Sequence, residues 1–384
     1  MGWNLLRSVC YFTGSRADYG PTRPIVRRLA TDPDIHLSVI AGAGHLVTEQ
    51  GGTLAELRAD GLDVDREVHM VLAGGTAAAA GKSIGLGVLG VVDALTQLRP
   101  EVLLVAGDRY EALAAVVAAV SLPVVVAHYG GGQLTRGSLD DRIRHAMTKL
   151  AHLHFVLTEE DRVRVVGMGE DPENVITVGP VTVEDGELAD LPDRVELEND
   201  LGVPLGSPLV VATYHPVTAR PGETIPALRA ILEALSELRD ARVVLTAPNL
   251  DVGGDLVLAV LREYVSNSDG RAVLWPSLGH RRYLGLVRCA DLVIGNSSSG
   301  LSEAPALGTP SVDVGSRQEG RAHPPSVVHS VGTVSEVREA IRRAMAMGKT
   351  AANRLCGGSP QLVVDEIRKR SFDGLILKTF HEGR

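Results

Sequence analysis

The stretch Ala-Asp-Leu-Val-Ile-Gly-Asn-Ser-Ser-Ser-Gly-Leu-Ser-Glu-Ala-Pro-Ala-Leu-Gly (residues 290–308) runs from apolar residues through small polar ones into a helix-forming segment. Residues 290–294 are typical of a buried strand, and residues 304–308 are typical of a short helix. Such a junction predicts an anion site, because the first N–H groups of a helix lack intrahelical partners and lie at its positive end. Glu303, about one turn into the helix, is placed to accept hydrogen bonds from a ribose diol. We interpret the stretch as a nucleotide diphosphate site. A capped structural helix is the alternative, since serine is a common N-cap.

The same strand-then-helix pattern recurs along the rest of the chain. Apolar runs typical of strands lie at residues 8–13, 36–40, 102–106, 124–128 and 154–157, and again at 209–213, 242–246, 272–276 and 292–294. Helical patterns separate them, including residues 337–345, with Ser335 as the expected N-cap, and a last helix that begins near Pro360. This alternation predicts an α/β fold with two doubly wound parallel sheets, in which ligands bind at the carboxyl ends of the strands.

The acidic, proline-containing segment at residues 185–194 interrupts the alternation and predicts a domain boundary. We therefore expect an N-terminal domain at residues 1–185. A nucleotide-binding domain is expected at residues 186–365. Residues 366–384 are expected to form a C-terminal helix that packs back on the N-terminal domain.

Composition argues against several functions. A length of 384 residues with 45% hydrophobic residues is enough for two domains with proper cores. Only 3% of the residues are aromatic and the net charge is −9. Nucleic-acid binding is therefore not expected, because it needs stacking side chains or a basic surface.

The cysteines and the apolar runs indicate the cellular compartment in which the protein is expected. Cys10, Cys289 and Cys356 are far apart and odd in number, which is typical of free thiols in a reducing cytoplasm. No Cys-X-X-Cys motif or Cys/His cluster predicts a zinc site. The N-terminus does not have the pattern of a signal peptide, and no uninterrupted apolar run is long enough to span a bilayer. We expect a cytoplasmic protein without membrane contact.

Polar clusters follow several of the expected strands in the first half of the chain. Arg16, in a Gly-Ser-Arg turn, can offer a charged fork to a diphosphate. Asp108 lies where a catalytic acid or base is expected, or it caps the next helix. Three glycines at residues 130–132 indicate close approach of the backbone to a ligand, or a flexible loop. Of Asp140 and Asp141, one can cap a helix and the other can face the cleft.

The second half of the chain carries two further candidates. His215 follows the first strand of this half and can bind or protonate a phosphate oxygen, although a lone histidine is more often structural. Arg317 and Arg321 follow the strand at residues 311–314 and suit a diphosphate or a nucleobase. A solvated basic loop is the competing interpretation of these arginines.

Taken in order, these motifs resemble the UDP-N-acetylglucosamine 2-epimerases, and most closely their hydrolysing branch. The resemblance covers nearly the whole chain. It rests on Gly-Ser-Arg-Ala-Asp-Tyr-Gly (14–20), Gly-Asp-Arg-Tyr-Glu (107–111), the segment 140–155, Tyr-His-Pro-Val-Thr (214–218), Pro-Asn (248–249), Gly-Asn-Ser-Ser-Ser-Gly (295–300) and Arg-Gln-Glu-Gly-Arg (317–321). It implies two Rossmann-like domains in a GT-B arrangement, a homodimer or homotetramer, a UDP-sugar substrate, and no metal or nicotinamide cofactor.

The resemblance also implies a reaction and its residues. Members of the family remove the C2 proton of the sugar and expel UDP, and the hydrolysing branch adds water to release the free 2-epimer. By resemblance, Asp108 and one of Asp140 and Asp141 are the acid/base carboxylates, His215 and Arg16 contact the diphosphate, and His45 lies near the sugar. Further nucleotide and substrate contacts are implied for Arg109, Asn249, Ser277, Asn296, Ser297, Ser298, Ser299, Gly300, Glu303, Arg317 and Arg321.

The chain departs from the family pattern after the strand at residues 124–128. Where the family has Ala-His-Ile-His-Gly-Gly-Glu, this chain has Ala-His-Tyr-Gly-Gly-Gly-Gln, so a histidine is replaced by Gly130 and a catalytic glutamate by Gln133. An amide cannot exchange a proton near neutral pH, and this replacement typically costs on the order of 10²–10⁴ in rate. Either another residue takes over, or the enzyme acts on a different nucleotide sugar in specialised metabolism. The motifs are also compatible with a GT-B glycosyltransferase and with a catalytically silent nucleotide-sugar binder.

Overall fold

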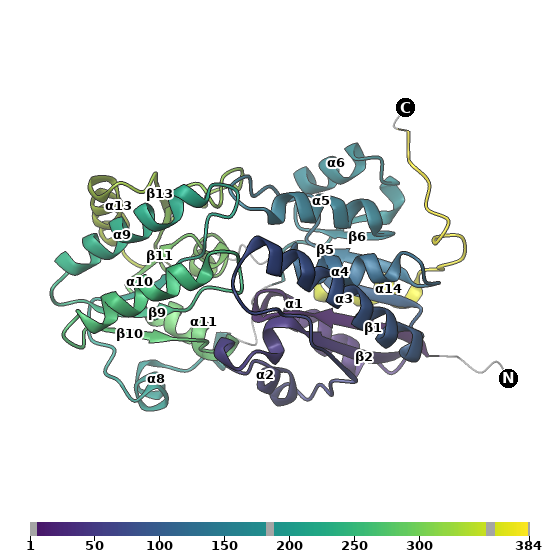
Figure 1. Cartoon of the computed structure of the whole chain (residues 1–384), viewed down its shortest axis with the longest axis horizontal. Helices are drawn as coiled ribbons and strands as arrows, with labels where there is room; N and C mark the ends of the chain where they lie inside the picture. Colours follow the sequence, from purple (N-terminus) through teal and green to yellow (C-terminus); the bar gives the residue numbers. More distant parts are fainter. Residues whose placement is uncertain (1–5, 182–187, 351–357, 383–384) are drawn as a thin grey trace.

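The computed structural model describes residues 6–181, 188–350 and 358–382, which form two α/β units side by side (Figure 1). The predicted fold class, with two doubly wound parallel sheets, is confirmed. The predicted domain boundary at residue 185 and the thiol of Cys356 lie outside the described residues.

The first sheet has seven parallel strands in the order β3-β2-β1-β4-β5-β6-β7. Its strands are β1 Arg7–Thr13, β2 Ile35–Gly42, β3 Arg66–Val68, β4 Val102–Ala106, β5 Val125–Tyr129, β6 Leu153–Val156 and β7 Val175–Thr177. The central strands are buried on both faces, which is why they occur in the sequence as continuous apolar runs.

Helices cover both faces of this sheet. They are α1 Arg16–Thr31, α2 Leu54–Ala59, α3 Ala77–Leu98, α4 Tyr110–Ala119, α5 Asp140–Leu150 and α6 Glu159–Gly167, with 3₁₀ turns η1 Ala43–Leu46, η2 Thr48–Gln50 and η3 Pro172–Asn174. One core joins the sheet to α1 and α2, and a second core joins its other face to α3, α4 and α5.

The second sheet has six parallel strands in the order β10-β9-β8-β11-β12-β13. Its strands are β8 Leu209–Thr213, β9 Arg242–Thr246, β10 Ala272–Trp275, β11 Leu292–Gly295, β12 Ser311–Val314 and β13 Val327–Ser330. Its helices are α8 Arg194–Leu201, α9 Pro221–Glu237, α10 Gly254–Ser266, α11 His280–Cys289, α12 Glu303–Ala306 and α13 Val334–Met347, with the 3₁₀ turn η4 Ser298–Gly300.

The end of the chain returns to the first unit through helix α14, Pro360–Lys369 (Figure 1). Val363, Val364 and Ile367 of α14 belong to the core that also contains α1. The helix begins at Pro360 as predicted, but it ends at Lys369. The expectation of a helix at residues 366–384 is therefore wrong for residues 370–382, which form turns and irregular structure.

Two helix boundaries also differ from the prediction. Helix α13 begins at Val334, and its N-cap is Thr333, whose side chain accepts a hydrogen bond from the N–H of Glu336, so Ser335 is not the cap. The helix predicted at residues 304–308 spans only Glu303–Ala306. Glu303 is thus its first residue and does not lie one turn inside it.

Helix α3 is, among the described residues, the one helix with the length and apolar composition to cross a membrane. Lys82 and Asp93 interrupt its apolar residues, so it does not occur in the sequence as an uninterrupted apolar run. In this structure α3 packs on α4 and on the first sheet, with Leu86 and Leu89 exposed at its outer face.

Candidate active site

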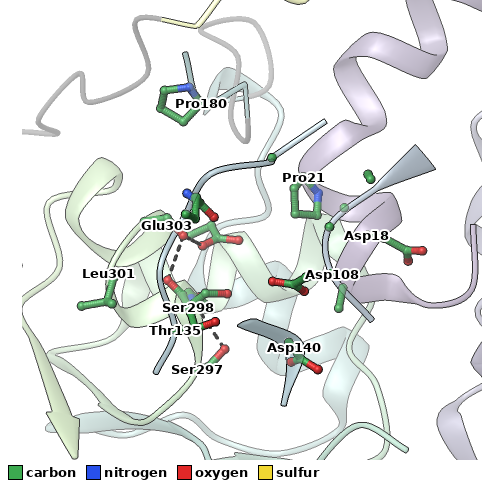
Figure 2. A pocket seen from close by; sticks show the side chains of 18 of the residues that line it. Asp18, Pro21, Asp108, Thr135, Asp140, Pro180, Ser297, Ser298, Leu301 and Glu303 are labelled. Carbon is green, nitrogen blue, oxygen red and sulfur yellow. Dashed lines mark hydrogen bonds between the residues drawn. The ribbon is translucent and has the colours of Figure 1, made fainter. Parts of the chain in front are cut away.

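A cavity of about 690 Å³ lies between the two units and is lined by residues from both. The predicted site residues that line it are Arg16, Asp108, Arg109, Gln133, Asp140, His215, Asn249, Ser277, Ser297, Ser298, Ser299, Glu303, Arg317 and Arg321. They come mainly from loops at the carboxyl ends of the strands, as expected for doubly wound sheets. Figure 2 shows Asp108 and Asp140 on one side of the cavity, and Ser297, Ser298 and Glu303 across from them.

Asp108 follows β4 and forms an ion pair with Arg144, whose side chain is fully buried on α5. Arg144 also donates to the carbonyl oxygen of Gln133 at 2.8 Å and to Oγ1 of Thr135 at 2.9 Å. Burial opposes ionisation of Asp108, but the charges of Arg144 and Arg321 outweigh it and lower the pKa of Asp108. Asp108 is therefore a carboxylate at neutral pH.

Asp140 and Asp141 begin α5 and have different surroundings. The Asp141 carboxylate accepts from the N–H of Thr135 at 2.6 Å and from Nη1 of Arg144 at 3.3 Å, and it does not line the cavity. The Asp140 carboxylate lines the cavity, with Nη2 of Arg317 at 3.9 Å. Asp140 therefore faces the cleft, whereas Asp141 braces the loop before α5.

The pKa of Asp140 is raised to about 7. Burial is the largest cause, and the negative charges of Asp108 and Asp251 add to it, while Arg109 and Arg317 oppose it. Two neighbouring carboxyl groups with pKa values pushed apart are a common arrangement in acid/base catalysis. At neutral pH, Asp140 can both release and accept a proton.

Gln133 lines the cavity beside Asp108 and Asp140. Its Oε1 accepts a hydrogen bond from Nη2 of Arg321 at 3.1 Å. Burial, together with the charge of Arg144, lowers the pKa of Arg321 to about 10, so its guanidinium remains protonated at neutral pH. Gln133 therefore holds a cation in place, and its amide carries no proton-transfer chemistry.

The serine cluster after β11 forms η4 and does not open a longer helix. Oγ of Ser297 accepts a hydrogen bond from the N–H of Ser299 at 3.3 Å, and the Tyr283 hydroxyl donates to Oγ of Ser299 at 2.7 Å. The Ser297 and Ser298 side chains lie at the cavity wall (Figure 2). The expected helix N-terminus is thus replaced by a short turn that offers hydroxyl groups.

His215 follows β8 and is held by Asn296, which follows β11. The Asn296 side chain accepts from the His215 N–H at 2.7 Å and donates to the His215 carbonyl oxygen at 2.8 Å. Nδ1 of His215 accepts from the N–H of Asn249 at 3.3 Å. Burial, with the charge of Arg317 next, holds the pKa of His215 well below its usual value, so its imidazole is neutral.

Arg16 and Arg109 both reach across from the first unit to the second. Arg16 donates to the carbonyl oxygens of Pro276 at 2.5 Å and Ala247 at 2.8 Å. Arg109 forms ion pairs with Glu111 at 2.7 Å and with Asp251 at 2.8 Å. Both guanidinium groups line the cavity while they hold the two units together.

Four predicted site residues do not line the cavity: His45, Asp141, Asn296 and Gly300. His45 is buried between Oγ1 of Thr13 at 2.8 Å and Oγ1 of Thr53 at 2.7 Å, and burial lowers its pKa to about 4. The Gly300 carbonyl oxygen accepts from Oγ of Ser311 at 2.5 Å. These contacts connect segments of the fold to one another and do not reach the cavity.

Gly130 and Gly132 differ in the space that a side chain would have at each position. Gly130 lines the cavity and has φ +91°, and a Cβ there would meet only the Gly107 nitrogen, at 4.0 Å. At Gly132, with φ +83°, a Cβ would lie 2.5 Å from the Asp161 carbonyl oxygen. Close packing of the protein therefore requires Gly132, whereas Gly130 leaves open space at the cavity wall.

Several residues of the site were missed. Arg144 and Gln318 lie inside quoted motifs, and Gln318 donates to the Asn296 carbonyl oxygen at 2.8 Å. Asp18 caps the turn before α1 by accepting from the N–H groups of Gly14 and Ser15, each at 2.8 Å. The charge of Arg144 was a usable signal, because an arginine that becomes buried needs a partner of opposite charge. Of the described residues, one group has the spacing of metal ligands, and none of its members lines this cavity.

Comparisons with known proteins agree with one another. The sequence model of a family described as UDP-N-acetylglucosamine 2-epimerase matches residues 27–360. A relative from Campylobacter jejuni subsp. jejuni serotype O:2, named GDP/UDP-N,N'-diacetylbacillosamine 2-epimerase (hydrolyzing), is 32% identical over 324 residues, or 84% of each chain. A relative from Legionella pneumophila subsp. pneumophila, named UDP-N,N'-diacetylbacillosamine 2-epimerase (hydrolyzing), is 31% identical over 341 residues, or 89% of each chain.

A solved structure of UDP-GlcNAc 2-epimerase from Neisseria meningitidis, bound to UDP-GlcNAc, is similar to this chain with a TM-score of 0.77. The likeness covers 94% of this chain and 100% of that chain at 17% sequence identity. At this identity the likeness shows the fold, which is the two-domain GT-B arrangement.

Proposed function

Because this chain belongs to the UDP-N-acetylglucosamine 2-epimerase family, we propose that it cleaves a UDP-activated 2-acetamido sugar into UDP and the free 2-epimer. The observation that carries the proposal is the pairing of Asp108 with Asp140 in one cavity. One carboxyl group is held ionised and the other has a pKa of about 7. In the family pattern a glutamate at position 133 transfers protons, and the amide of Gln133 cannot. The pair Asp108 and Asp140 can supply this proton transfer.

The nucleotide is proposed to lie against the second unit. The hydroxyl groups of Ser297 and Ser298 suit the diphosphate, and Arg317 and Arg321 offer the positive charge that the departing UDP requires. Glu303, at the same end of the cavity, suits the ribose diol. Uridine itself is taken from the names of the relatives.

Asp140 is proposed to remove the C2 proton. As the C2–H bond breaks, its electrons form the C1=C2 bond and the C1–O bond breaks, so UDP leaves with the bonding electrons of C1–O. A base with a pKa near 7 is ionised over much of the neutral range and is a stronger base than Asp108, whose pKa is lowered. Arg317, at 3.9 Å from Asp140, favours the ionised form before the reaction.

Water then adds across the C1=C2 bond. Asp108 is proposed to accept a proton from the attacking water, because Arg144 and Arg321 keep it ionised, and the hydroxyl group goes to C1. Asp108 then passes this proton to C2 on the face opposite Asp140, which inverts C2, and Asp140 releases the abstracted proton to solvent. Arg144 is therefore a positioning residue that acts through Asp108.

The sugar is proposed to carry more than the 2-acetamido group. Gly130 leaves open space where the family pattern has a histidine. The polar residues Thr158, Asp161 and Arg164 line the same cavity and can bind a further substituent. The two curated relatives above are named for a diacetamido sugar, which has one such substituent.

We also propose a cytoplasmic homo-oligomer. Cys10 and Cys289 are free thiols, which suits a reducing compartment. The outer faces of α3 and α4 present Leu86, Leu89 and Val117, which are 41%, 67% and 39% exposed. An apolar surface formed by two packed helices suits contact with a second copy of the chain.

Release of UDP without any acceptor tests the proposed function. The purified chain is incubated with UDP-N-acetylglucosamine or with UDP-N,N'-diacetylbacillosamine, and UDP is quantified by ion-exchange chromatography. We expect UDP from at least one of the two, and faster release from the diacetamido substrate. Tight UDP binding without turnover of either substrate would support a silent binder instead. Dependence of UDP release on an added sugar acceptor would support a glycosyltransferase.

A further inference from the structure

Asp313, His323 and His329 form a cluster at the edge of the second sheet, and none of the three lines the cavity. Asp313 on β12 and His329 on β13 are direct partners in the parallel register, so their side chains project from the same face of the sheet. His323 reaches the same point from the loop between the two strands. Oδ2 of Asp313 lies 3.0 Å from Nε2 of His323 and 3.2 Å from Nδ1 of His329.

These distances come close to those of a metal site. In tetrahedral zinc sites the ligand nitrogen and oxygen atoms lie about 2.0–2.2 Å from the ion, which places neighbouring ligand atoms roughly 3.3–3.6 Å apart, a few tenths of an ångström more than the two distances above. The three ligand atoms all lie within 4.8 Å of one another. Two imidazoles and one carboxylate are a common ligand set for zinc and related divalent ions, with water in the remaining position.

A second observation concerns Asp313 itself. Its carboxylate is only 3% exposed, and among the described residues Oδ1 has no hydrogen-bond partner. A buried carboxylate oxygen without a partner is costly, and a bound cation would satisfy it. The two histidines are partly exposed, so an ion and its water ligands can reach the cluster from solvent.

We propose that Asp313, His323 and His329 bind one divalent transition-metal ion, with zinc as the first candidate. His323 follows Arg317, Arg321 and Ala322 in the loop that lines the cavity. A bound ion would tie this loop to β12 and β13 and so fix the two arginines beside Asp108 and Asp140. Binding itself rests on the cluster alone, and only the effect on the arginines rests on the proposed function.

Metal binding is measured on the full chain, first stripped with a chelator and then dialysed against a series of Zn²⁺ concentrations. We expect one zinc per chain in the wild type. His323→Ala and His329→Ala should each weaken binding by at least about 100-fold, because a removed ligand leaves only two protein donors. His36→Ala is the matched control, since His36 is an exposed strand histidine outside the cluster, and it should bind zinc as the wild type does.

Cobalt substitution and amide hydrogen exchange supply two readouts that do not depend on activity. Co²⁺ in place of zinc should give the visible absorption of a site with nitrogen ligands, and both His→Ala variants should lose it. Zinc should slow amide exchange in residues 315–326 of the wild type and leave the His323→Ala variant unchanged. Absence of zinc binding to the wild type would overturn the proposal, as would unchanged binding in both cluster variants. These results do not depend on whether the chain turns over a UDP-sugar.

Discussion

Asp140→Asn separates the catalytic role of Asp140 from its effect on stability. The substitution keeps the shape of the side chain but removes the carboxylate that accepts the C2 proton. We expect kcat for UDP release to fall by on the order of 10²–10⁴, because general acid/base catalysis contributes that much. In the wild type, kcat/KM should rise with pH through about 7, since the ionised form of Asp140 is the base. In the variant this rise should be lost.

The same substitution should stabilise the protein at alkaline pH. The pKa of Asp140 is raised from 3.8 to about 7, and each pKa unit corresponds to 1.36 kcal/mol, so the ionised group costs the folded state about 4 kcal/mol. A raised carboxyl pKa lowers the free energy of unfolding progressively as pH rises from the unfolded to the folded value. Below about pH 4 the group has no effect. The gain from Asp140→Asn is therefore at most about 2 kcal/mol at pH 5 and about 4 kcal/mol at pH 8.

Urea unfolding at the two pH values, together with UDP release, tests both effects. Asp141→Asn is the matched control, because Asp141 is the neighbouring residue on α5 but does not line the cavity and binds Thr135 and Arg144 instead. It should lower stability at both pH values and leave the pH dependence of kcat/KM in place. The reasoning would be refuted if Asp140→Asn kept more than a tenth of the wild-type rate, or if it were no more stabilising at pH 8 than at pH 5.

Four further substitutions test separate features of the site and the surface. Gln133→Glu should add a negative charge to the cavity, which raises the pKa of Asp140 and shifts the rise in kcat/KM to higher pH. The rate should not rise more than about tenfold, and an unshifted pH profile would contradict this prediction. Arg144→Met should lower the free energy of unfolding by about 3–5 kcal/mol in urea, because it leaves Asp108 without its counter-charge; a loss below about 1 kcal/mol would argue against the pair. His45→Ala should cost stability, about 1–3 kcal/mol, and leave KM within about twofold, whereas a large rise in KM would restore His45 to the site. Leu89→Asp should shift the mass in light scattering from oligomer to monomer, and an unchanged mass would place the interface elsewhere. Leu256→Asp, which is as exposed but on α10, is its control.

The strands could be predicted closely from the sequence. The bounds of β4, β8 and β9 match the predicted residues 102–106, 209–213 and 242–246. Strands that are buried on both faces are mostly apolar, so the apolar run locates each of them, even though β9 begins at Arg242 and ends at Thr246. Short helices at strand ends were less predictable. The segment after β11 became a 3₁₀ turn followed by a four-residue helix, because its first hydroxyl groups bond within the turn.

The cavity was predictable to the extent that strand ends meet at one edge of a sheet. Asp108, His215 and the serine turn follow strands and line the cavity. The choice between Asp140 and Asp141 was open in the sequence, since adjacent residues on a helix point about 100° apart and a residue pattern does not fix the absolute orientation of the helix. His45 was placed near the sugar by resemblance, but its partners Thr13 and Thr53 lie in other segments of the chain, and their contacts become visible only in the fold.

Transfer of a solvent proton to C2 is the central claim, and proton NMR in heavy water measures it directly. The chain is incubated in D₂O with UDP-N,N'-diacetylbacillosamine or UDP-N-acetylglucosamine until UDP accumulates. The account predicts a free sugar that is inverted at C2 and carries deuterium there, with both changes slowed alike in the Asp140→Asn variant. A released sugar that keeps its C2 proton and its original configuration would mean simple hydrolysis at C1 and would contradict the account.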